Sequence, residues 1–173
     1  MYAKWISWGI LIALIILAAV TGQRGGPKVD QEAPLFSAKT LSGDDFILNE
    51  HRGKVILLDF WATWCPPCRR SLPAIEKVYE RYKDDPQVWV GTVNKENLSE
   101  RTLNTWLKKM RLKFPVIRDP HEEVSSKYRV RSIPTLVVIN PEGRVSFAQS
   151  GLPNLNQRGL VNHFAELIER ARE

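Results

Sequence analysis

Cysteine and histidine are scarce in this sequence of 173 residues, which holds only Cys65, Cys68 and three histidines. Two cysteines separated by two residues close too short a loop to gain much entropy as a structural crosslink. A zinc site normally needs two more Cys or His ligands, and His51, His121 and His163 lie far from the pair. We therefore expect no metal and no cofactor other than a redox-active disulfide.

A basic stripe interleaved with aromatic residues is also lacking. The net charge of +6 comes from 25 Lys and Arg against 19 Asp and Glu, and these residues are scattered along the chain. A nucleic-acid partner is therefore not expected. The hydrophobic content of 43% and the length are ordinary for one globular domain with an appendage, large enough to bury its own core.

Charged residues are absent from positions 5–23, which are mostly Ile, Leu, Ala and Val. As a helix this segment would span about 28 Å, close to the hydrocarbon thickness of a bilayer. A buried core helix or a cleaved signal peptide would be alternatives, but no small-x-small cleavage site stands out at 18–22. We expect an uncleaved membrane anchor, whose orientation the flanking Lys and Arg residues do not set.

The rest of the chain divides into a linker and a globular domain. Residues 1–23 are the expected anchor or uncleaved signal, 24–32 the linker, and 33–173 the domain. Hydrophobic periodicity predicts an α/β fold, a central mixed sheet covered by helices on both faces, with an N-terminal β-hairpin and a helix-strand insert. The expected strands are 35–38, 46–48, 55–60, 88–93, 114–117, 135–139 and 145–148, and the expected helices are 69–83, 103–110, 122–128 and 160–168.

The Cys65-Pro66-Pro67-Cys68 string falls where an apolar strand gives way to a helix. The first turn of a helix offers unpaired N–H groups and the positive end of the dipole, which stabilise a thiolate. Prolines are tolerated there but cannot donate to the Cys65 sulfur, so the Cys68 N–H is the main backbone donor. The pattern predicts thiol–disulfide exchange, with Cys65 the exposed, attacking thiol and Cys68 the shielded, resolving one.

Two further positions bear on that chemistry. Asp59 lies inside the apolar strand, so its carboxyl should have a raised pKa and could relay a proton to or from Cys68. The alternative is that Asp59 points to a polar edge and only makes hydrogen bonds. Ile133-Pro134-Thr135 begins a strand, where Pro134 is either preceded by a cis bond beside the sulfurs or is an ordinary strand-start proline.

These strings resemble the thioredoxin superfamily, and most closely its membrane-tethered, TlpA/ResA-like branch. The resemblance is carried by the Trp-Cys-Pro-Pro-Cys string at 64–68 with the residues before it, and by the distant Ile-Pro-Thr at 133–135. Segments 33–36, 53–55 and 99–117 are similar to that branch as well. The match extends over roughly 33–168, which is nearly the whole predicted domain.

The resemblance implies a thioredoxin-like fold in which Cys65 attacks, Cys68 resolves, and a cis Pro134 faces the disulfide. Trp64, Pro66, Pro67, Ile133 and Pro134 would form the substrate groove. Such proteins act as extracytoplasmic reductants, here on the periplasmic side of a bacterial inner membrane, for apocytochrome c or other cysteine-bearing protein clients. A membrane dithiol carrier would supply the electrons.

The sequence departs from that branch at two positions near the thiols. Many members have Glu three residues after the second cysteine, where this chain has Ser71, and many have Asn where this chain has Asp59. Both departures concern proton handling, and Asp59 makes the chain more similar to thioredoxin itself.

Two other functions are compatible with a lone cysteine pair. A thiol peroxidase shares the fold and the Ala-Pro-x-Phe feature but would need Thr three residues before the nucleophile, where this chain has Ala62. A copper(I)-binding module would use both thiols, although no Met or His cluster accompanies them. Peroxide turnover and a metal titration of the reduced protein would distinguish these two from disulfide exchange.

Overall fold

The structure is a computed structural model that describes residues 28–173. The expected anchor at 5–23, and the Gly-Gly-Pro that begins the expected linker, lie outside the described residues. Within 28–173, no helix combines the length and the apolar character needed to cross a bilayer.

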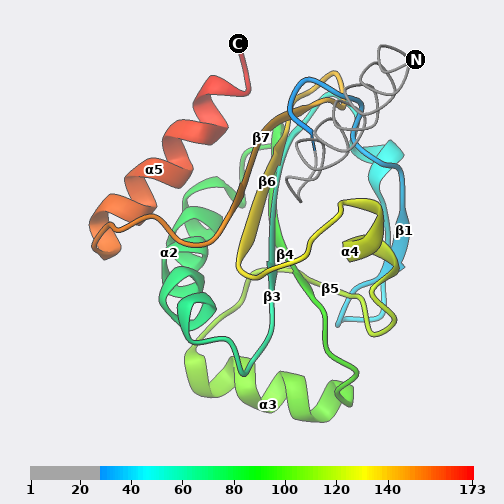
Figure 1. Ribbon diagram of the computed structural model, residues 1–173, viewed down its shortest axis with the longest axis vertical. Helices are drawn as coiled ribbons and strands as arrows, with labels where there is room; N and C mark the ends of the chain where they lie inside the picture. The colour runs from blue at the N-terminus through cyan, green and yellow to red at the C-terminus, as the bar shows by residue number, and fades with distance from the viewer. Residues whose placement is uncertain (1–27) are drawn as a thin grey trace, which may run out of the picture.

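Five strands form a mixed sheet in the order β5-β4-β3-β6-β7 (Figure 1). Strand β3 is central, pairing in parallel with β4 and antiparallel with β6, while β5 is parallel to β4 and β7 antiparallel to β6. The predicted α/β fold with a mixed sheet is confirmed. The strands are β3 (Val55–Trp61), β4 (Val88–Asn94), β5 (Val116–Arg118), β6 (Thr135–Ile139) and β7 (Val145–Ser150).

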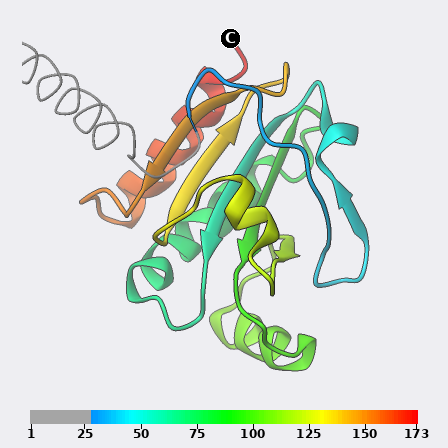
Figure 2. The same ribbon diagram turned by 45° about the vertical axis from the view of Figure 1, so that its right-hand side comes forward.

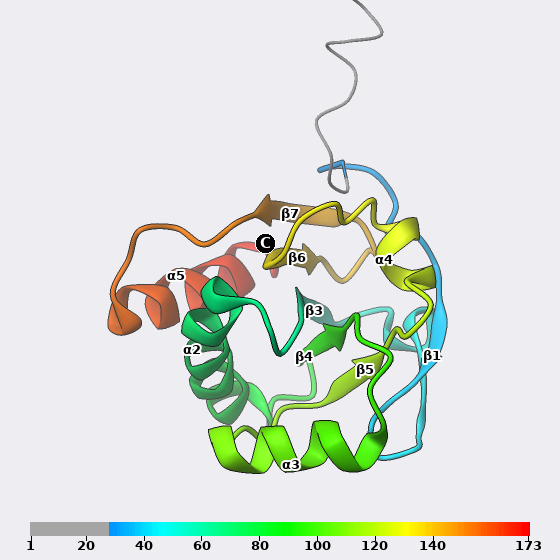
Figure 3. The same ribbon diagram turned by 60° about the horizontal axis from the view of Figure 1, so that its bottom comes forward.

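Helices cover both faces of this sheet, as the sequence predicted. Helices α2, α3 and α5 lie on one side, and α4 with the β1–β2 hairpin lies on the other (Figures 2 and 3). The hairpin and helices are β1 (Ser37–Lys39), β2 (Asp45–Ile47), the 3-10 turn η1 (Leu48–His51), α2 (Pro66–Tyr82), α3 (Glu100–Met110), α4 (Glu123–Lys127) and α5 (Gln157–Arg170).

All seven residues of β3 are buried, which explains its continuous apolar run. Side chains alternate across a strand, so Leu57 and Trp61 pack toward α2, α3 and α5, whereas Leu58 and Phe60 pack toward α4 and the hairpin. Burial of each such side chain contributes about 1.5–3 kcal/mol. Asp59 lies between Leu57 and Trp61 in this alternation, and its carboxyl is therefore directed to the α2 and α5 side.

Local signals fix where the helices begin. The Ser99 hydroxyl accepts a hydrogen bond from Thr102 N at 3.2 Å and caps α3. Asn156 caps α5 in the same way through Gly159 N at 2.8 Å. Helix α2 begins at Pro66, three residues before the start expected from hydrophobic periodicity, because prolines fit the first turn of a helix without contributing to its apolar face.

The chain joins the domain along strand β7. Asp30 N donates to the Val145 carbonyl at 2.8 Å, and Ala33 N donates to the Gly143 carbonyl at 2.9 Å. An isolated bridge between Glu32 and Arg144 lies between these two bonds. The residues that precede β1 are therefore fixed at the edge of the sheet opposite β5.

Candidate active site

Cys65 and Cys68 form a disulfide at the N-terminus of α2. Cys65 is the N-cap residue, and its sulfur accepts a hydrogen bond from Cys68 N at 3.2 Å. Pro66 and Pro67 occupy the first two helical positions, so the Cys68 N–H is the backbone donor that reaches the sulfur, as predicted. The pair thus lies where the helix dipole and an N–H group both stabilise negative charge on Cys65.

Both cysteines are more enclosed than the sequence suggested. Cys65 is 2% exposed and Cys68 is fully buried, so in the disulfide form Cys65 is not the exposed thiol that the sequence predicted. The chain folds back before the helix, with Cys65 N donating to the Ala62 carbonyl at 3.2 Å. Around the disulfide, Trp64 is 65% exposed and the two prolines are exposed. The surface above the sulfurs is therefore apolar and accessible.

The segment before Cys65 is held by hydrogen bonds that the sequence analysis missed. Glu96 accepts from Thr63 N at 2.5 Å and from the Thr63 hydroxyl at 2.9 Å, and Asn94 Nδ2 donates to the same carboxylate at 3.2 Å. On the other side, Arg69 Nε donates to the Thr63 carbonyl at 2.8 Å. A signal for the Thr63–Glu96 contact existed: each residue stands two positions beyond the end of a parallel strand, and Trp61 pairs with Asn94 in register.

A groove of about 860 Å³ opens beside Trp64 and includes Ile133 among its lining residues. Lys95 and Glu122 also line it and form an ion pair at 3.3 Å. Its remaining lining residues are Ala62, Glu96, Asn97, Leu98, Val130, Arg131 and Ser132. The predicted groove residues Trp64 and Ile133 are thus brought together, whereas Pro66 and Pro67 are exposed next to it and do not line it.

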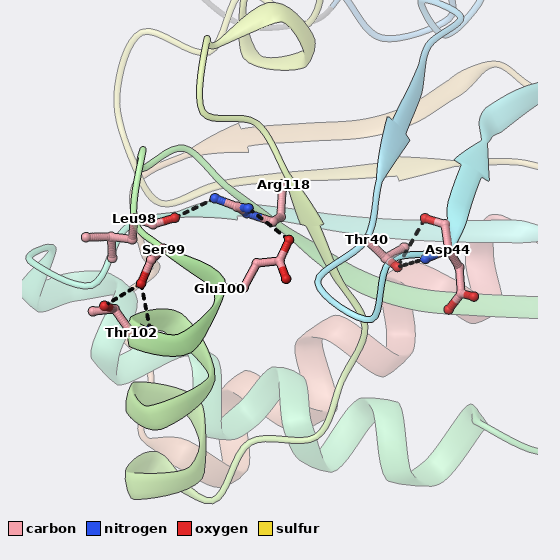
Figure 4. Close-up of polar contacts among 7 residues, drawn as sticks. All are labelled: Thr40, Asp44, Leu98, Ser99, Glu100, Thr102 and Arg118. Atoms are coloured by element: carbon pink, nitrogen blue, oxygen red, sulfur yellow. Dashed lines mark hydrogen bonds and ion pairs between the residues drawn. The ribbon is translucent and has the colours of Figure 1, made fainter.

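One wall of this groove is fixed to the sheet by Arg118. Its guanidinium donates to the Leu98 carbonyl and lies 3.4 Å from the Glu100 carboxylate, which places it between the loop after β4 and the start of α3 (Figure 4). Ser99 caps α3 between these two contacts, as Figure 4 also shows. The loop at 95–99 is therefore held at its far end as well as at Glu96.

The peptide bond between Ile133 and Pro134 is cis, as the resemblance implied. The Thr135 hydroxyl donates to the Ser132 carbonyl at 2.7 Å, and Gly151 N donates to the Pro134 carbonyl at 2.7 Å, which fixes the loop to β7. Ile133 packs against the core cluster that contains both cysteines. Within the described residues, its own backbone N–H and carbonyl make no backbone hydrogen bond.

Asp59 lies in β3 against Ser71 of α2 and is 2% exposed. Burial is the larger cause that raises the pKa of Asp59 to about 8, and a hydrogen bond from Ser71 acts in the opposite direction. The Ser71 Oγ lies 3.5 Å from Asp59 Oδ2 and 3.0 Å from the Cys68 carbonyl oxygen. The raised pKa predicted from the sequence agrees with this burial, and the contact with Ser71 was not foreseen.

A small cavity connects Asp59 with the underside of Pro134. Its volume is about 10 Å³, enough for one water molecule. Its lining residues are Asp59, Ser71, Pro134, Leu136, Gln149, Gly151, Leu152, Pro153, His163 and Phe164. Since Gln149 and His163 are partly exposed, this cavity lies between the buried carboxyl and the surface.

A cysteine pair that caps a helix beside a mixed sheet, with a cis-proline loop and a buried carboxyl behind it, defines a thioredoxin-like thiol–disulfide oxidoreductase. The chain belongs to the AhpC/TSA family, whose sequence profile matches residues 29–148. It is a redox enzyme, since its relatives are named thiol–disulfide oxidoreductases.

Individual relatives support this assignment. The chain is 36% identical over 152 residues to the thioredoxin-like protein YneN of Bacillus subtilis, covering 83% of this chain and 87% of that protein. It is 30% identical over 171 residues to the thiol–disulfide oxidoreductase ResA of Halalkalibacterium halodurans, covering 95% and 94%. The crystal structure of the exposed lipoprotein thioredoxin Etrx1 of Streptococcus pneumoniae superposes with a TM-score of 0.62 at 29% identity, covering 76% and 98%.

Proposed function

We propose that this protein is an extracytoplasmic reductant that opens disulfides in protein clients through Cys65 and Cys68. The observation that carries the proposal is the position of Cys65, which caps α2 and receives the Cys68 N–H at 3.2 Å. That position favours a thiolate at Cys65 in the reduced protein. The apolar surface formed by Trp64 beside it would receive the client.

Reduction of a client then takes two steps. The Cys65 thiolate attacks one sulfur of the client disulfide, forming a mixed disulfide and releasing the other client sulfur as a thiolate that takes a proton. The Cys68 thiol then loses its proton and attacks the Cys65 sulfur. The bond between Cys65 and the client breaks, and the client gains two electrons while the pair is oxidised to the disulfide that the structure contains.

Asp59 is the proposed acceptor of the Cys68 proton. It is buried on the helix side of the sheet. The Ser71 hydroxyl contacts both the Asp59 carboxyl and the Cys68 backbone carbonyl. With a pKa of about 8, the carboxyl can both accept and release a proton near neutral pH. After each turnover the proton would leave toward solvent through the water-sized cavity.

Clients would bind in the groove between Trp64 and Ile133. The backbone N–H and carbonyl of Ile133 make no backbone hydrogen bond to any of residues 28–173 and suit an extended client segment, since such segments bind by main-chain hydrogen bonds with side chains in adjacent pockets. The mixed polar and apolar lining of the groove favours a flexible protein segment that carries a cysteine pair.

The cellular setting is a finer part of the same proposal. Residues 1–23 would anchor the protein, 24–32 would be the linker, and 33–173 would be the catalytic domain on the periplasmic side of a bacterial inner membrane. The uncharged run at 5–23 and the similarity to an exposed lipoprotein thioredoxin support this placement. By its resemblance to the TlpA/ResA-like branch, the client would be apocytochrome c and the electron donor a membrane dithiol protein.

A peptide disulfide with the Cys-x-x-Cys-His haem-attachment sequence tests this proposal directly. The reduced Cys68→Ser protein should accumulate a mixed disulfide with the peptide, whereas Cys65→Ser should form none. The reduction potential of the wild-type pair should lie near the thioredoxin value of about −270 mV. A potential near −120 mV would assign the opposite, disulfide-forming direction, and turnover of peroxide in place of the peptide would assign a peroxidase.

A further inference from the structure

Ser71 lies between the buried carboxyl of Asp59 and the backbone carbonyl of Cys68. Its Oγ is 3.5 Å from Asp59 Oδ2 and 3.0 Å from the Cys68 carbonyl oxygen, and the residue is 1% exposed. A serine hydroxyl has one hydrogen to donate and two lone pairs that accept. It can therefore donate to one of these two oxygens at a time.

The protonation of Asp59 decides which oxygen receives that hydrogen. When Asp59 is neutral, its O–H can donate to Ser71 Oγ, which in turn donates to the Cys68 carbonyl. When Asp59 is ionised it can only accept, so Ser71 turns its hydrogen to the carboxylate and leaves the carbonyl. Because a hydrogen bond to a carboxylate is stronger than one to a neutral group, Ser71 favours the ionised form.

Few other groups can compete with Ser71 for this carboxyl. Helix α5 contributes one titratable side chain to the cavity, His163, and β6 and β7 contribute the uncharged Leu136 and Gln149. The cysteines do not line the cavity, and Ser71 connects it to the Cys68 backbone carbonyl at the start of α2. No Lys or Arg of the described residues lines the cavity, so Ser71 is the donor nearest to Asp59 from α2.

We propose that Ser71 is a positioning residue that allows Asp59 to take the Cys68 proton, by donating its hydroxyl hydrogen to the carboxylate and releasing the Cys68 carbonyl. This inference rests on the proposed function, because it assigns Ser71 to the step in which Cys68 resolves the mixed disulfide. The resolution step itself is unchanged: one proton passes from Cys68 to Asp59, and the Ser71 hydroxyl only reorients.

Loss of the hydroxyl should make Asp59 a poorer proton acceptor near neutral pH. In Ser71→Ala the carboxylate loses its donor, so the midpoint of its titration should rise, and a rise of one unit leaves tenfold less carboxylate well below the midpoint. The resolution step should then be about three- to tenfold slower at pH 7. The two proteins should reach the same rate near pH 10, where both carboxyls are ionised.

The experiment uses the full-length protein in five forms: wild type, Ser71→Ala, Ser71→Thr, Ser125→Ala and Asp59→Asn. Ser71→Thr keeps a hydroxyl and is the rescue variant. Ser125 is the matched control, since it is also 1% exposed but lies on α4 and its hydroxyl has no hydrogen-bond partner among the described residues. Carboxyl-carbon NMR gives the Asp59 titration in the oxidised protein, and single-turnover reduction of the disulfide peptide gives the rate at each pH.

The expected result in Ser71→Ala is an upward shift of two midpoints, that of the Asp59 NMR titration and that of the pH dependence of the reduction rate. Ser71→Thr and Ser125→Ala should behave as wild type. Unchanged midpoints in Ser71→Ala, together with slow resolution in Asp59→Asn, would overturn the role of Ser71 and leave that of Asp59 intact. If Asp59→Asn resolves at the wild-type rate, Asp59 is not the proton acceptor and the inference about Ser71 falls with it. Circular dichroism of each variant at the assay temperature shows that the protein compared is folded.

Discussion

Two hollows near the start of α2, neither of them lined by a cysteine, differ sharply in size and chemistry. The larger one, here called the client side, is the groove of about 860 Å³ between Trp64 and Ile133. The smaller one, here called the proton side, is the cavity of about 10 Å³ lined by Asp59 and Ser71. One side has room for a segment of another protein, and the other has room for a single water molecule.

This difference indicates that client binding and proton transfer during disulfide exchange take place in separate parts of the site. A large partner would approach from the client side, where Trp64 next to Cys65 is 65% exposed. A proton can be held at Asp59 because the proton side excludes bulk water, which raises the pKa of the carboxyl. Variants that disturb one side should leave the measurable properties of the other unchanged.

The largest effect should be a pH dependence of stability that comes from the proton side. The pKa of Asp59 is raised to about 8 in the fold, whereas an unfolded Asp has a pKa near 3.9. The folded protein therefore binds the extra proton between these values, and the Asp59 contribution is fully present below about pH 4 and lost as pH rises through 8. The free energy of unfolding should fall by roughly 5 kcal/mol at most across this window.

Asp59→Asn isolates this contribution, since the Asn side chain does not titrate. Urea unfolding of the oxidised wild-type and variant proteins at each pH gives a difference curve, in which groups such as His51 cancel. The difference should rise in favour of the variant between pH 4 and 8. A flat difference curve would show that Asp59 titrates at its ordinary value and that the proton side is open to bulk water.

The same variant should have the largest effect on catalysis. Asn cannot accept the Cys68 proton, and general-base contributions are typically 10²–10⁴-fold, so resolution at pH 8 should slow by about 100-fold. Formation of the mixed disulfide by Cys65 should be nearly unchanged, because that step occurs on the client side. Stopped-flow measurement of the two steps separates them, with Asp45→Asn on the exposed hairpin as the control. Equal slowing of both steps would contradict the division into two sides.

The elements that could be predicted from the sequence are those set by short-range rules. The position of Cys65 and the two prolines at the start of a helix follows from a string of four consecutive residues, Cys65 to Cys68. The direction of Asp59 follows from alternation along β3 with Leu57 and Trp61, which meet the helix side. The mixed sheet follows from the order of apolar runs, although the 3-10 turn after β2 and the early start of α2 did not show in hydrophobic spacing.

The contacts that the sequence did not reveal depend on packing between elements. Ser71 reaches Asp59 only because α2 packs across β3, and a buried serine leaves no periodic signal of its partner. Thr63 and Glu96 meet because β3 and β4 pair in register, which requires knowledge of which strands are neighbours. The low exposure of Cys65 in the disulfide form likewise depends on how the loop from Ala62 folds back over it.

A smaller effect is expected from the loop that carries the client side. Glu96→Ala removes the acceptor of the Thr63 N–H and hydroxyl. Hydrogen bonds to charged groups contribute about 1.5–3 kcal/mol each, but Glu96 is only half-buried and water can replace part of these bonds, so the free energy of unfolding should fall by about 2 kcal/mol. Peptide reduction should show a raised KM, whereas the Asp59 titration should stay in place. Thermal unfolding, peptide-reduction kinetics and NMR measure these three outcomes.

Glu100→Ala is the matched control for this loop. Glu100 is another glutamate next to this loop and forms an ion pair with Arg118 at 3.4 Å. Its side chain is 65% exposed, so its loss should change the free energy of unfolding by less than about 1 kcal/mol. Equal destabilisation by Glu96→Ala and Glu100→Ala would mean that the hydrogen bonds of Thr63 do not hold the loop. A shifted Asp59 titration in Glu96→Ala would mean that the two sides are coupled through the segment before Cys65.

The smallest effect should come from Trp64, which is 65% exposed and therefore supports little of the fold. Trp64→Ala should leave the free energy of unfolding within about 0.5 kcal/mol of wild type, as expected for a surface position. Because an aromatic ring beside the sulfurs gives a client apolar contact area, KM for the disulfide peptide should rise by about three- to tenfold, equivalent to roughly 1 kcal/mol. Leu35→Ala, another exposed apolar position that does not line the groove, should change neither quantity. If Trp64→Ala instead lowers kcat with KM unchanged, the ring contributes to the attack by Cys65 rather than to client binding. Trp64 would then belong with the reacting sulfurs and not with the client side.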